Sequence, residues 1–323
     1  MTAASETLRG GIDLGGTKIQ TVIVDAGGAV RGEARQPTPT SGGPTDVARA
    51  MEDALREAAS AAGTKPEDLA GVGVGSPGDA DGSTGIVSGA RNLPGWEGSF
   101  PLGEVLSEAL GTEVRIGNDV QVAVEGEYAL GAGKQHKSLL GVWWGTGVGG
   151  GIILDGEPWL GRGAAGEIGH MVVKRDGARC PCGRRGCMEA YAGRAAMEAK
   201  ARHEHAQGVE TEIFKIMEKR GKDRLTSSVW EHALREGDAL TESLLRRAVR
   251  YLGTGIASAV NLLDVEAVVI GGGLGVRFGD HFMDDLHKEM HKHLFVDDNP
   301  PLMQVAELGD LGGAIGASLL VGR

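Results

Sequence analysis

The sequence lacks three features that would assign it to a nucleic-acid-binding, membrane or secreted class. Its 33 basic and 44 acidic residues give a net charge of −11, so it has no basic excess to neutralise the phosphates of a nucleic acid. No apolar stretch reaches the roughly 20 residues that span a bilayer. The N-terminus has no basic segment followed by an apolar one, as a signal peptide has. We therefore expect no nucleic-acid partner, no membrane association and a cytoplasmic location.

Cysteine is also scarce, and its distribution excludes a disulfide framework. The three cysteines, Cys180, Cys182 and Cys187, fall within eight residues, and an odd, clustered set in a cytosolic protein indicates metal ligands. With His170 they form a Cys₃His set, which is typical of a closed, tetrahedral zinc site. Four protein ligands leave no open position, so the sequence predicts a structural zinc. Chance clustering of free thiols is the alternative.

Glycine, in contrast, is abundant, with 55 among 323 residues against a usual share of about 7%. The glycines cluster where apolar runs end. The run 10–14 leads into Gly15-Gly16-Thr17 and then into a second apolar run, and the run 138–144 leads in the same way into Gly145-Thr146-Gly147. Two copies of strand, Gly/Thr turn and strand predict two similar α/β lobes with a central cleft between them.

This repeat and the chain length, which suits about two domains, predict the domain boundaries. We expect a small N-terminal lobe over residues 1–118, closed by a C-terminal helix over 311–323. A larger lobe should cover 119–310 and carry a long insertion, about 157–235, that holds the zinc ligands. A helix is predicted over 47–62 because Val47, Met51, Leu55 and Ala58 fall on one helical face.

Both Gly/Thr turns are candidates for phosphate binding. Bare glycines let backbone N–H groups approach phosphate oxygens, and Thr17 and Lys18 add a hydroxyl and a cation. An ordinary glycine hairpin is the alternative for each turn alone. The chain has no G-x-x-x-x-G-K-[ST] motif, which excludes a P-loop enzyme. Residues 145–150 match G-x-G-x-x-G, but a strand follows where a dinucleotide site requires a helix.

The pair Asn118-Asp119 ends one predicted strand and opens a helix. Asn and Asp are both favoured helix caps, and from this pair alone the cap is the favoured interpretation. The functional alternative is a carboxylate that accepts a proton from a sugar hydroxyl during phosphoryl transfer. Glu167 and Glu189 flank the metal ligands; they are either solvated surface charges or acceptors for sugar hydroxyls, held by a metal-braced loop.

Seven motifs in order resemble the ROK family (repressors, open reading frames and sugar kinases), and within it the bacterial ATP-dependent glucokinases. They are DLGGTK (13–18), GVGSPGD (73–79), RNLPGW (91–96), GNDV (117–120), GTGVGGG (145–151), GEIGH (166–170) and CPCGRRGCMEAY (180–191). The resemblance covers nearly the whole chain, and the cysteine segment is its most specific part. It implies the actin-like ATPase fold of hexokinases, with ATP, Mg²⁺ and a structural Zn²⁺.

The resemblance also implies roles for individual residues. Asp119 would be the catalytic base. Sugar contacts would come from Gly78, Asn92, Asn118, Asp119, Glu167, His170 and Glu189. Phosphates and their magnesium would be held by Asp13, Gly15, Gly16, Thr17, Lys18, Thr146 and Gly147, with Asp13 reaching the metal through water, and the adenosine side by Gly272 and Gly273. The partner would be a hexose, and we expect a homodimer or homotetramer.

Glucose is the expected acceptor, through its 6-hydroxyl, but other functions stay open. A kinase for fructose, mannose, glucosamine, N-acetylglucosamine or N-acetylmannosamine would need the same base and metal loop. A sugar-responsive repressor would carry a DNA-binding domain before the first Gly/Thr turn, for which the sequence ahead of Asp13 leaves no room. A non-catalytic sugar-binding module would not need Asp119 together with two phosphate turns. Polyphosphate is an alternative donor.

Overall fold

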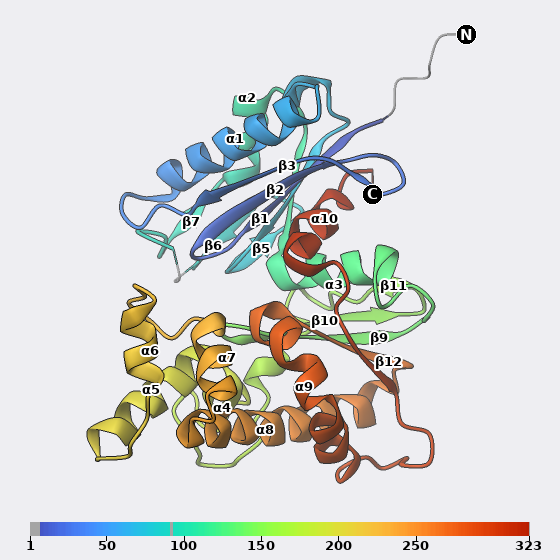
Figure 1. Cartoon of the computed structure of the whole chain (residues 1–323). Helices are drawn as coiled ribbons and strands as arrows, with labels where there is room; N and C mark the ends of the chain where they lie inside the picture. Colours follow the sequence, from blue (N-terminus) through green and yellow to red (C-terminus); the bar gives the residue numbers. More distant parts are fainter. Residues whose placement is uncertain (1–6, 91–92, 323) are drawn as a thin grey trace. The chain divides into compact units, whose positions relative to one another are not determined.

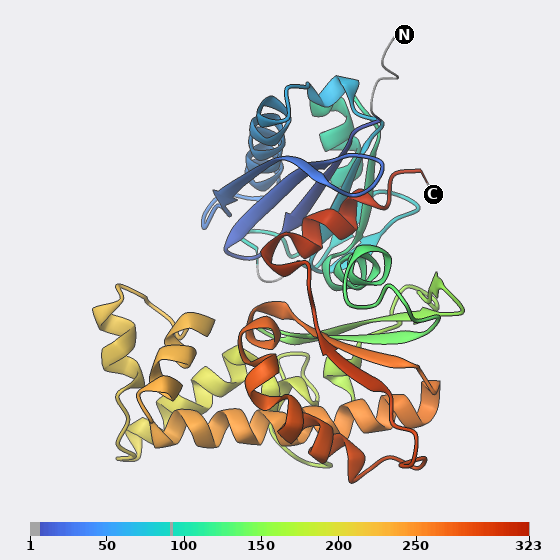
Figure 2. The ribbon, with the colours of Figure 1, turned by 45° about the vertical axis from the view of Figure 1, so that its right-hand side comes forward.

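The computed structural model describes residues 7–90 and 93–322, and it divides into two compact units. The first unit comprises Met1–Lys134 and Glu307–Arg323, and the second comprises Gln135–Ala306. Each unit contains a five-stranded sheet of mixed direction with helices packed on it (Figure 1, and Figure 2 after a 45° turn). The prediction of two α/β units, each opening with a strand–turn–strand repeat, is confirmed.

The sheet of the first unit places several predicted site residues at one edge. Its strand order is β3-β2-β1-β4-β8. The bounds are β1 Arg9–Leu14, β2 Lys18–Val24, β3 Val30–Pro37, β4 Val72–Ser76 and β8 Val114–Asn118. Strands β1, β4 and β8 run parallel, with Asp13 opposite Gly75 and Ser76 opposite Asn118. The carboxyl ends of these three strands therefore lie side by side.

Helices cover both faces of this first sheet (Figure 1). Helices α1 (Pro44–Ala61) and α2 (Leu102–Leu110) lie on one face, and α3 (Asp119–Leu130) and α10 (Gly312–Ser318) lie on the other. The apolar stripe predicted for α1 is fully buried. Helix α10 lies so close to β1 that a Cβ on Gly11 would collide with the Ala314 carbonyl, so a glycine is required there.

The boundary between the units lies later than we expected. We placed the end of the first lobe at residue 118, but α3 packs within the first unit, which continues to Lys134. The reason is close packing of α3 against α10: a Cβ on Gly126 would lie 3.0 Å from the Gly316 Cα. The chain likewise returns to the first unit at Glu307, a few residues before the predicted closing helix.

Both connections between the units are held by one buried carboxylate, Glu127 of α3, which is 1% exposed. Its Oε2 accepts hydrogen bonds from the N–H groups of Ala132 and Glu307, each at 3.0 Å. Its Oε1 accepts one from Leu308 N–H at 2.8 Å. Ala132 lies just before the chain leaves the first unit, and Glu307 lies where the chain returns to it. One side chain therefore binds both connecting segments.

The glycine-rich stretch 76–100 contains a small antiparallel sheet. Its strands, in the order β5-β6-β7, are β5 Asp79–Asp81, β6 Ile86–Ser88 and β7 Ser99–Phe100. Trp96 packs edge-on against Phe100, with ring centroids 5.5 Å apart, and is buried. This aromatic contact gives the short strands a core of their own.

The second sheet brings two glycine turns to one end of the second unit. Its strand order is β11-β10-β9-β12-β13. The bounds are β9 Leu139–Trp144, β10 Val148–Leu154, β11 Glu157–Pro158, β12 Ala267–Gly271 and β13 Leu302–Val305. Strands β9 and β12 run parallel, with Gly271 opposite Trp143. The turn after β9 and the turn after β12 are therefore neighbours.

The second unit is otherwise helical. The long helix α8 and helix α9 pack together beneath the sheet, and the helices before α8 belong to the predicted insertion (Figures 1 and 2). The bounds are α4 Glu189–Ala192, α5 Arg194–Ala206, α6 Ile213–Lys219, α7 Ser227–Arg235, α8 Ala239–Leu263 and α9 Gly272–His291. Short 3₁₀ turns cover Pro66–Asp68, Ile168–His170 and Gly309–Leu311.

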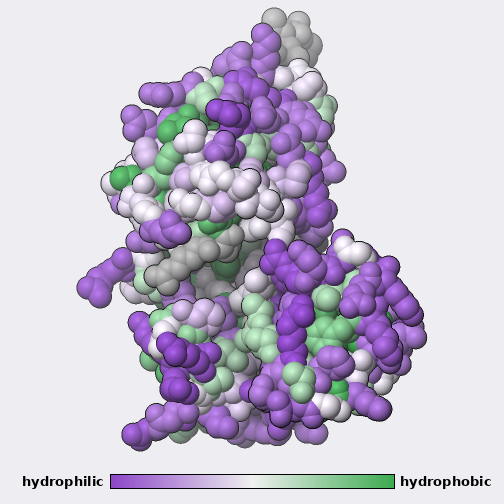
Figure 3. Space-filling view, turned by 90° about the vertical axis from the view of Figure 1, so that its left-hand side faces the viewer, coloured by the Kyte–Doolittle hydropathy of each residue, from purple (hydrophilic) through white to green (hydrophobic). Residues whose placement is uncertain are grey.

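The surface is mainly hydrophilic on the side that Figure 3 shows, with apolar residues in scattered small groups. Among the residues that the structure describes, none of the helices combines the length and the apolar character that crossing a bilayer requires.

Candidate functional site

The first Gly/Thr turn is a tight hairpin between β1 and β2. Gly15 N–H donates to the Lys18 carbonyl at 3.0 Å, and Gly16 and Thr17 are exposed. The buried Thr38 stabilises the turn, because its hydroxyl donates to the Gly15 carbonyl at 2.6 Å. The Lys18 ammonium lies 3.4 Å from Asp310. Sequence reasoning missed Thr38 and Asp310, since neither belongs to a recognisable motif.

Asp13 and Asp119 form an electrostatically coupled pair at the strand ends. Burial, and secondly the Asp119 carboxylate, raise the pKa of Asp13 to about 7, while Lys18 acts in the opposite direction. The Asp13 carboxyl rests against the start of α10, where a Cβ on Gly313 would lie 2.7 Å from its Cγ. A buried carboxyl group beside a second carboxylate forms a place where a cation is favourable.

For Asn118 and Asp119 the sequence left two roles open, a helix cap and a catalytic carboxylate. Asn118 is the N-cap of α3, and its Oδ1 accepts hydrogen bonds from Val120 and Gln121 N–H, each at 3.0 Å. Asp119 is the first residue of the helix, is half-buried, and its Oδ1 lies 2.9 Å from Val120 N. The cap therefore does not depend on Asp119. The Asn118 amide N–H₂ group retains its donor capacity.

Of the two predicted sugar contacts in the 76–100 stretch, the structure describes one. Gly78 has a φ of +88°, and a Cβ there would lie 2.6 Å from the Ser88 carbonyl. Its backbone conformation and its close neighbours therefore both favour glycine at this position, which lies beside the end of β4. Asn92 lies outside the described residues.

The four predicted metal ligands converge in the second unit. The ligand atoms of His170, Cys180, Cys182 and Cys187 all lie within 4.8 Å of one another. Cys182 and Cys187 Sγ are 3.7 Å apart, and Cys180 Sγ is 3.7 Å from His170 Nδ1. Two sulfurs on a tetrahedral zinc lie about 3.8 Å apart, because each Zn–S bond is about 2.3 Å. The donor set and its spacing fit zinc.

The thiol chemistry of this cluster also fits a cation. Burial raises the pKa of Cys180 to about 12, and burial likewise raises the pKa of Cys187. A hydrogen bond from the Arg184 backbone lowers the pKa of Cys182. A bound zinc would displace the protons of these thiols and hold the sulfurs as thiolates.

Two glutamates connect the metal cluster to its surroundings. His170 Nε2, on the ring edge away from Cys180, lies 3.9 Å from the exposed Glu167 carboxylate. Glu189 Oε1 lies 3.8 Å from Cys180 Sγ, and its Oε2 accepts a hydrogen bond from Val148 N–H at 3.0 Å. Glu189 therefore links the cluster to the end of the second Gly/Thr turn. The predicted site residues of the second unit form one continuous structure.

The second Gly/Thr turn is fixed by the helices that follow the cysteine segment. Gly145 N–H donates to the Gly147 carbonyl at 3.0 Å, which closes the turn. Arg194 N–H donates to the Gly145 carbonyl at 3.0 Å and Ala195 N–H to the Thr146 carbonyl at 3.1 Å, so the start of α5 docks on it. A Cβ on Gly147 would collide with Glu189 Oε2. A side chain at 147 would therefore have to displace the Glu189 carboxylate.

The turn after β12 lies beside this one, as the strand register requires. Gly272 has a φ of +79°, and a Cβ there would lie 2.7 Å from the Trp144 carbonyl, whereas a Cβ on Gly145 would stay 3.9 Å from Gly273 N. Gly272 also begins the 20-residue helix α9. Exposed Thr146 and Gly273, the open side of Gly145 and a helix N-terminus make one surface with anion-binding character.

Comparison with known proteins places the chain in a family. The sequence model of the ROK family matches residues 9–323. The chain belongs to the ROK family. It is 33% identical over 312 residues to a glucokinase of Streptomyces coelicolor, covering 95% of each chain. It is 30% identical to an N-acetyl-D-glucosamine kinase of Escherichia fergusonii over 322 residues, covering 96% of this chain and 98% of the relative.

Solved structures of other ROK proteins share the fold. A ROK family glucokinase from Streptomyces griseus, determined in complex with glucose and AMPPNP, is 31% identical, has a TM-score of 0.82, and covers 97% of this chain and 99% of its own. A ROK hexokinase from Thermus thermophilus is 32% identical with a TM-score of 0.78, covering 98% of both chains. These relationships confirm the family and the actin-like α/β fold that the motifs implied.

Proposed function

We propose that this ROK protein is an ATP-dependent hexokinase, specifically a glucokinase, that transfers the γ-phosphoryl group of ATP to the 6-hydroxyl of glucose. The observation that carries the proposal is the similarity over almost the whole chain to the Streptomyces griseus glucokinase with glucose and AMPPNP. Its support within the chain comes from each unit separately: a carboxyl pair beside a Gly/Thr turn in the first unit, and a Gly/Thr turn bonded to Glu189 beside the Cys₃His cluster in the second.

Asp119 is the proposed general base. A sugar 6-hydroxyl is a weak nucleophile, and a carboxylate within about 2.6–3.2 Å of it can accept its proton during transfer. The side chain stands at the first position of α3 while Asn118 carries the cap. Asn118, with Gly78 and Asn92 from the neighbouring stretch, would hold sugar hydroxyls on the same unit.

The other carboxyl of the pair, Asp13, suits a magnesium site. A magnesium bound with the nucleotide neutralises the β- and γ-phosphates, and Asp13 would hold it through water. The cation would also stabilise ionised Asp13, whose pKa is otherwise raised to about 7. Gly15, Gly16, Thr17 and Lys18 would contact phosphates from the first unit.

The predicted site residues of the second unit have proposed roles of their own. Thr146 and Gly147 would line the phosphate path, and Gly272 and Gly273 would border the adenosine. Glu167, His170 and Glu189 would accept and donate hydrogen bonds to the sugar. The two ring nitrogens of His170 would have different partners. Nδ1, which faces the cysteines, would bind the zinc, and Nε2, which faces Glu167, would contact the sugar. The zinc would be structural, since all four positions come from the protein.

An N-acetylglucosamine kinase is the second candidate, because a relative of that name covers almost the whole chain at 30% identity. An ADP-release assay with ATP and magnesium over a panel of hexoses and amino sugars separates the candidates. We expect the highest kcat/KM for glucose. A higher kcat/KM for N-acetylglucosamine, or for another sugar of the panel, would identify that sugar as the acceptor in place of glucose. No ADP release with any sugar would overturn the kinase assignment. A homodimeric or homotetrameric state and a cytoplasmic location stay predictions.

A further inference from the structure

Arg194 holds the second Gly/Thr turn with its side chain as well as its backbone. It is the first residue of α5, and its Nη2 donates to Thr146 Oγ1 at 2.7 Å. Its Nη1 donates to the Leu225 carbonyl at 2.9 Å. The guanidinium is thereby fixed at the one exposed hydroxyl of the turn. No motif pointed to this residue.

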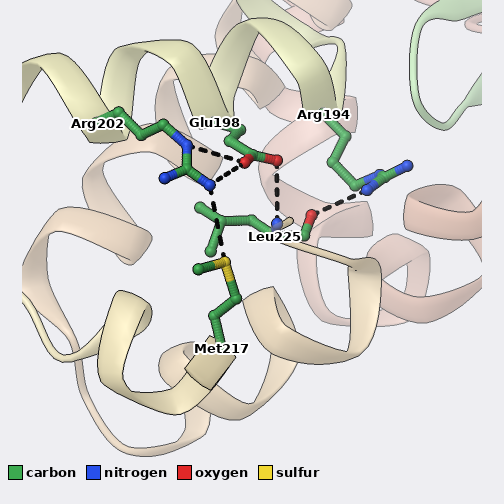
Figure 4. A network of polar contacts seen from close by, with 5 residues as sticks. All are labelled: Arg194, Glu198, Arg202, Met217 and Leu225. Carbon is green, nitrogen blue, oxygen red and sulfur yellow. Dashed lines mark hydrogen bonds and ion pairs between the residues drawn. The ribbon is translucent and has the colours of Figure 1, made fainter. Parts of the chain in front are cut away.

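The surroundings of Arg194 leave its positive charge without a carboxylate partner. Glu198, one helical turn later, would be the usual i,i+4 partner. It pairs instead with Arg202, at 2.6 Å, and accepts a hydrogen bond from Leu225 N–H at 3.0 Å (Figure 4). Within the described part of the chain, no carboxylate lies within ion-pair distance of Arg194. Both of its hydrogen-bond acceptors are neutral oxygens.

Three features of this position disfavour a cation unless an anion joins it. Burial, and secondly the nearby Arg224, lower the pKa of the Arg194 guanidinium, and the Glu198 carboxylate offsets this only in part. The positive end of a helix dipole repels a cation at the first helical position. A sequence selected only for stability would place an acidic or neutral residue here. An arginine kept at such a point beside a phosphate-type turn indicates a bound anion.

The guanidinium is also preorganised. Leu225 is held through both of its backbone groups, because Glu198 accepts its N–H and Arg194 donates to its carbonyl (Figure 4). Arg202 in turn fixes Glu198 with bonds of 3.0 and 2.6 Å. A planar guanidinium held this way loses little freedom when it binds phosphate oxygens.

We propose that Arg194 binds the phosphate chain of the nucleotide together with the hydroxyl of Thr146, an inference that rests on the kinase function proposed above. A phosphate oxygen takes the place of Thr146 Oγ1 as acceptor for one guanidinium N–H. The Thr146 hydroxyl then donates to the same phosphate. Arg194 is thus a substrate-binding residue for the donor and has no contact with the sugar.

Calorimetric titration of the full chain with magnesium and ATP, ADP or adenosine tests this role. For Arg194→Gln we expect the Kd for ATP and ADP to rise about 10-fold or more, since charge-assisted bonds to phosphate are lost. The Kd for adenosine should change less than about 2-fold, because adenosine has no phosphate. Arg194→Lys, which keeps the charge but not the fork, should lie between the wild type and Arg194→Gln.

Lys200→Gln is the matched control, since it removes a positive charge from the same helix and Lys200 pairs with Glu204 outside this network; its ATP affinity should stay near the wild-type value. Unchanged ATP affinity in Arg194→Gln, or an equal loss for ATP and adenosine, would overturn the role. Should Arg194→Gln fail to fold, wild-type ATP affinity in a folded Arg194→Lys would overturn it equally. Absence of ATP binding by the wild type would instead overturn the proposed function, and this role with it.

Discussion

Asn118 and Asp119 show what sequence reasoning could and could not resolve for single residues. Both are good helix caps, so the pair alone favoured a structural role. The structure assigns the cap to Asn118, so capping does not account for an aspartate at 119. Thr38 and Arg194 were not predicted, because each acts through a hydrogen bond to a distant turn, and such contacts have no sequence periodicity.

The Asp13 carboxyl makes stability depend on pH in nucleotide-free and metal-free protein. Its pKa is raised from 3.8 to about 7 in the folded state, so the folded state binds the proton more tightly than the unfolded state does. The contribution of Asp13 to stability is therefore most favourable below pH 4, falls as the pH rises through this window, and reaches its full penalty above pH 7. The largest destabilisation that this pKa shift can cause is about 4 kcal/mol. We reduce it to about 1–2 kcal/mol because Asp13 is only half-buried.

Asp13→Asn should remove this penalty. We expect the variant to melt at a higher temperature than the wild type at pH 8, and the difference to vanish near pH 4. Melting curves between pH 4 and pH 8, in the absence of magnesium and nucleotide, measure it. A difference that is constant across this range would show that Asp13 does not titrate as described.

At the level of elements, the two Gly/Thr turns and the cysteine segment were predictable because each has a local pattern. The strand register explains why the turns at residues 145–147 and 271–273 become neighbours, and no local pattern contains that information. The structure also corrects the interpretation of Gly147. Its Cβ would meet Glu189, so a bulky substitution there would test packing as much as phosphate binding.

Gly145→Ala is the cleaner probe of the second turn. The added methyl group would have only Gly273 N near it, at 3.9 Å, so the fold should tolerate it. It would narrow the path of the phosphates, and we expect the KM for ATP to rise roughly 10-fold, about 1.4 kcal/mol, with an unchanged melting temperature. Gly98→Ala, with no atom within 4 Å of the new Cβ, is the control. An unchanged KM for ATP would argue against a phosphate turn.

The metal cluster should couple to both substrate sites through Glu189. Cys182→Ser removes one ligand of the Cys₃His set, and a loss of about 2–3 kcal/mol would lower the melting temperature by roughly 4–12 °C. Because Glu189 also bonds Val148 N–H at the second turn, KM should rise for ATP as well as for glucose. Metal analysis should find about one zinc per chain in the wild type. Zinc-free wild-type protein with full activity would contradict this.

At the scale of the whole molecule, the lobe boundary was the least predictable feature. It depends on α3 packing against α10 through Gly126 and Gly316, a contact between segments almost 200 residues apart. The hydrogen bonds of Glu127 to both connecting segments were equally unpredictable, since a single glutamate in a helix forms no recognisable sequence pattern. The repeat of strand, turn and strand was visible, and it correctly predicted two α/β units.

Glu127→Gln should weaken the attachment of both connecting segments. The amide replaces one carboxylate oxygen by an N–H₂ group that would face N–H donors, so buried donors lose their acceptor. We expect a loss of about 2–4 kcal/mol in the free energy of unfolding, measured by urea denaturation. Glu67→Gln, at an exposed position, should change it by less than about 0.5 kcal/mol. Equal effects of the two substitutions would remove Glu127 from this role.

The central claim is that Asp119, the first residue of α3, accepts the proton of the glucose 6-hydroxyl during phosphoryl transfer. Asp119→Asn tests it most directly, because Asn118 retains the helix cap and the shape of the side chain is preserved. Steady-state kinetics, glucose and ATP affinities and the melting temperature should be measured together. We predict near-normal binding of both substrates, a melting temperature close to the wild type, and a kcat lowered about 10²-fold or more. A kcat close to the wild-type value would contradict the account.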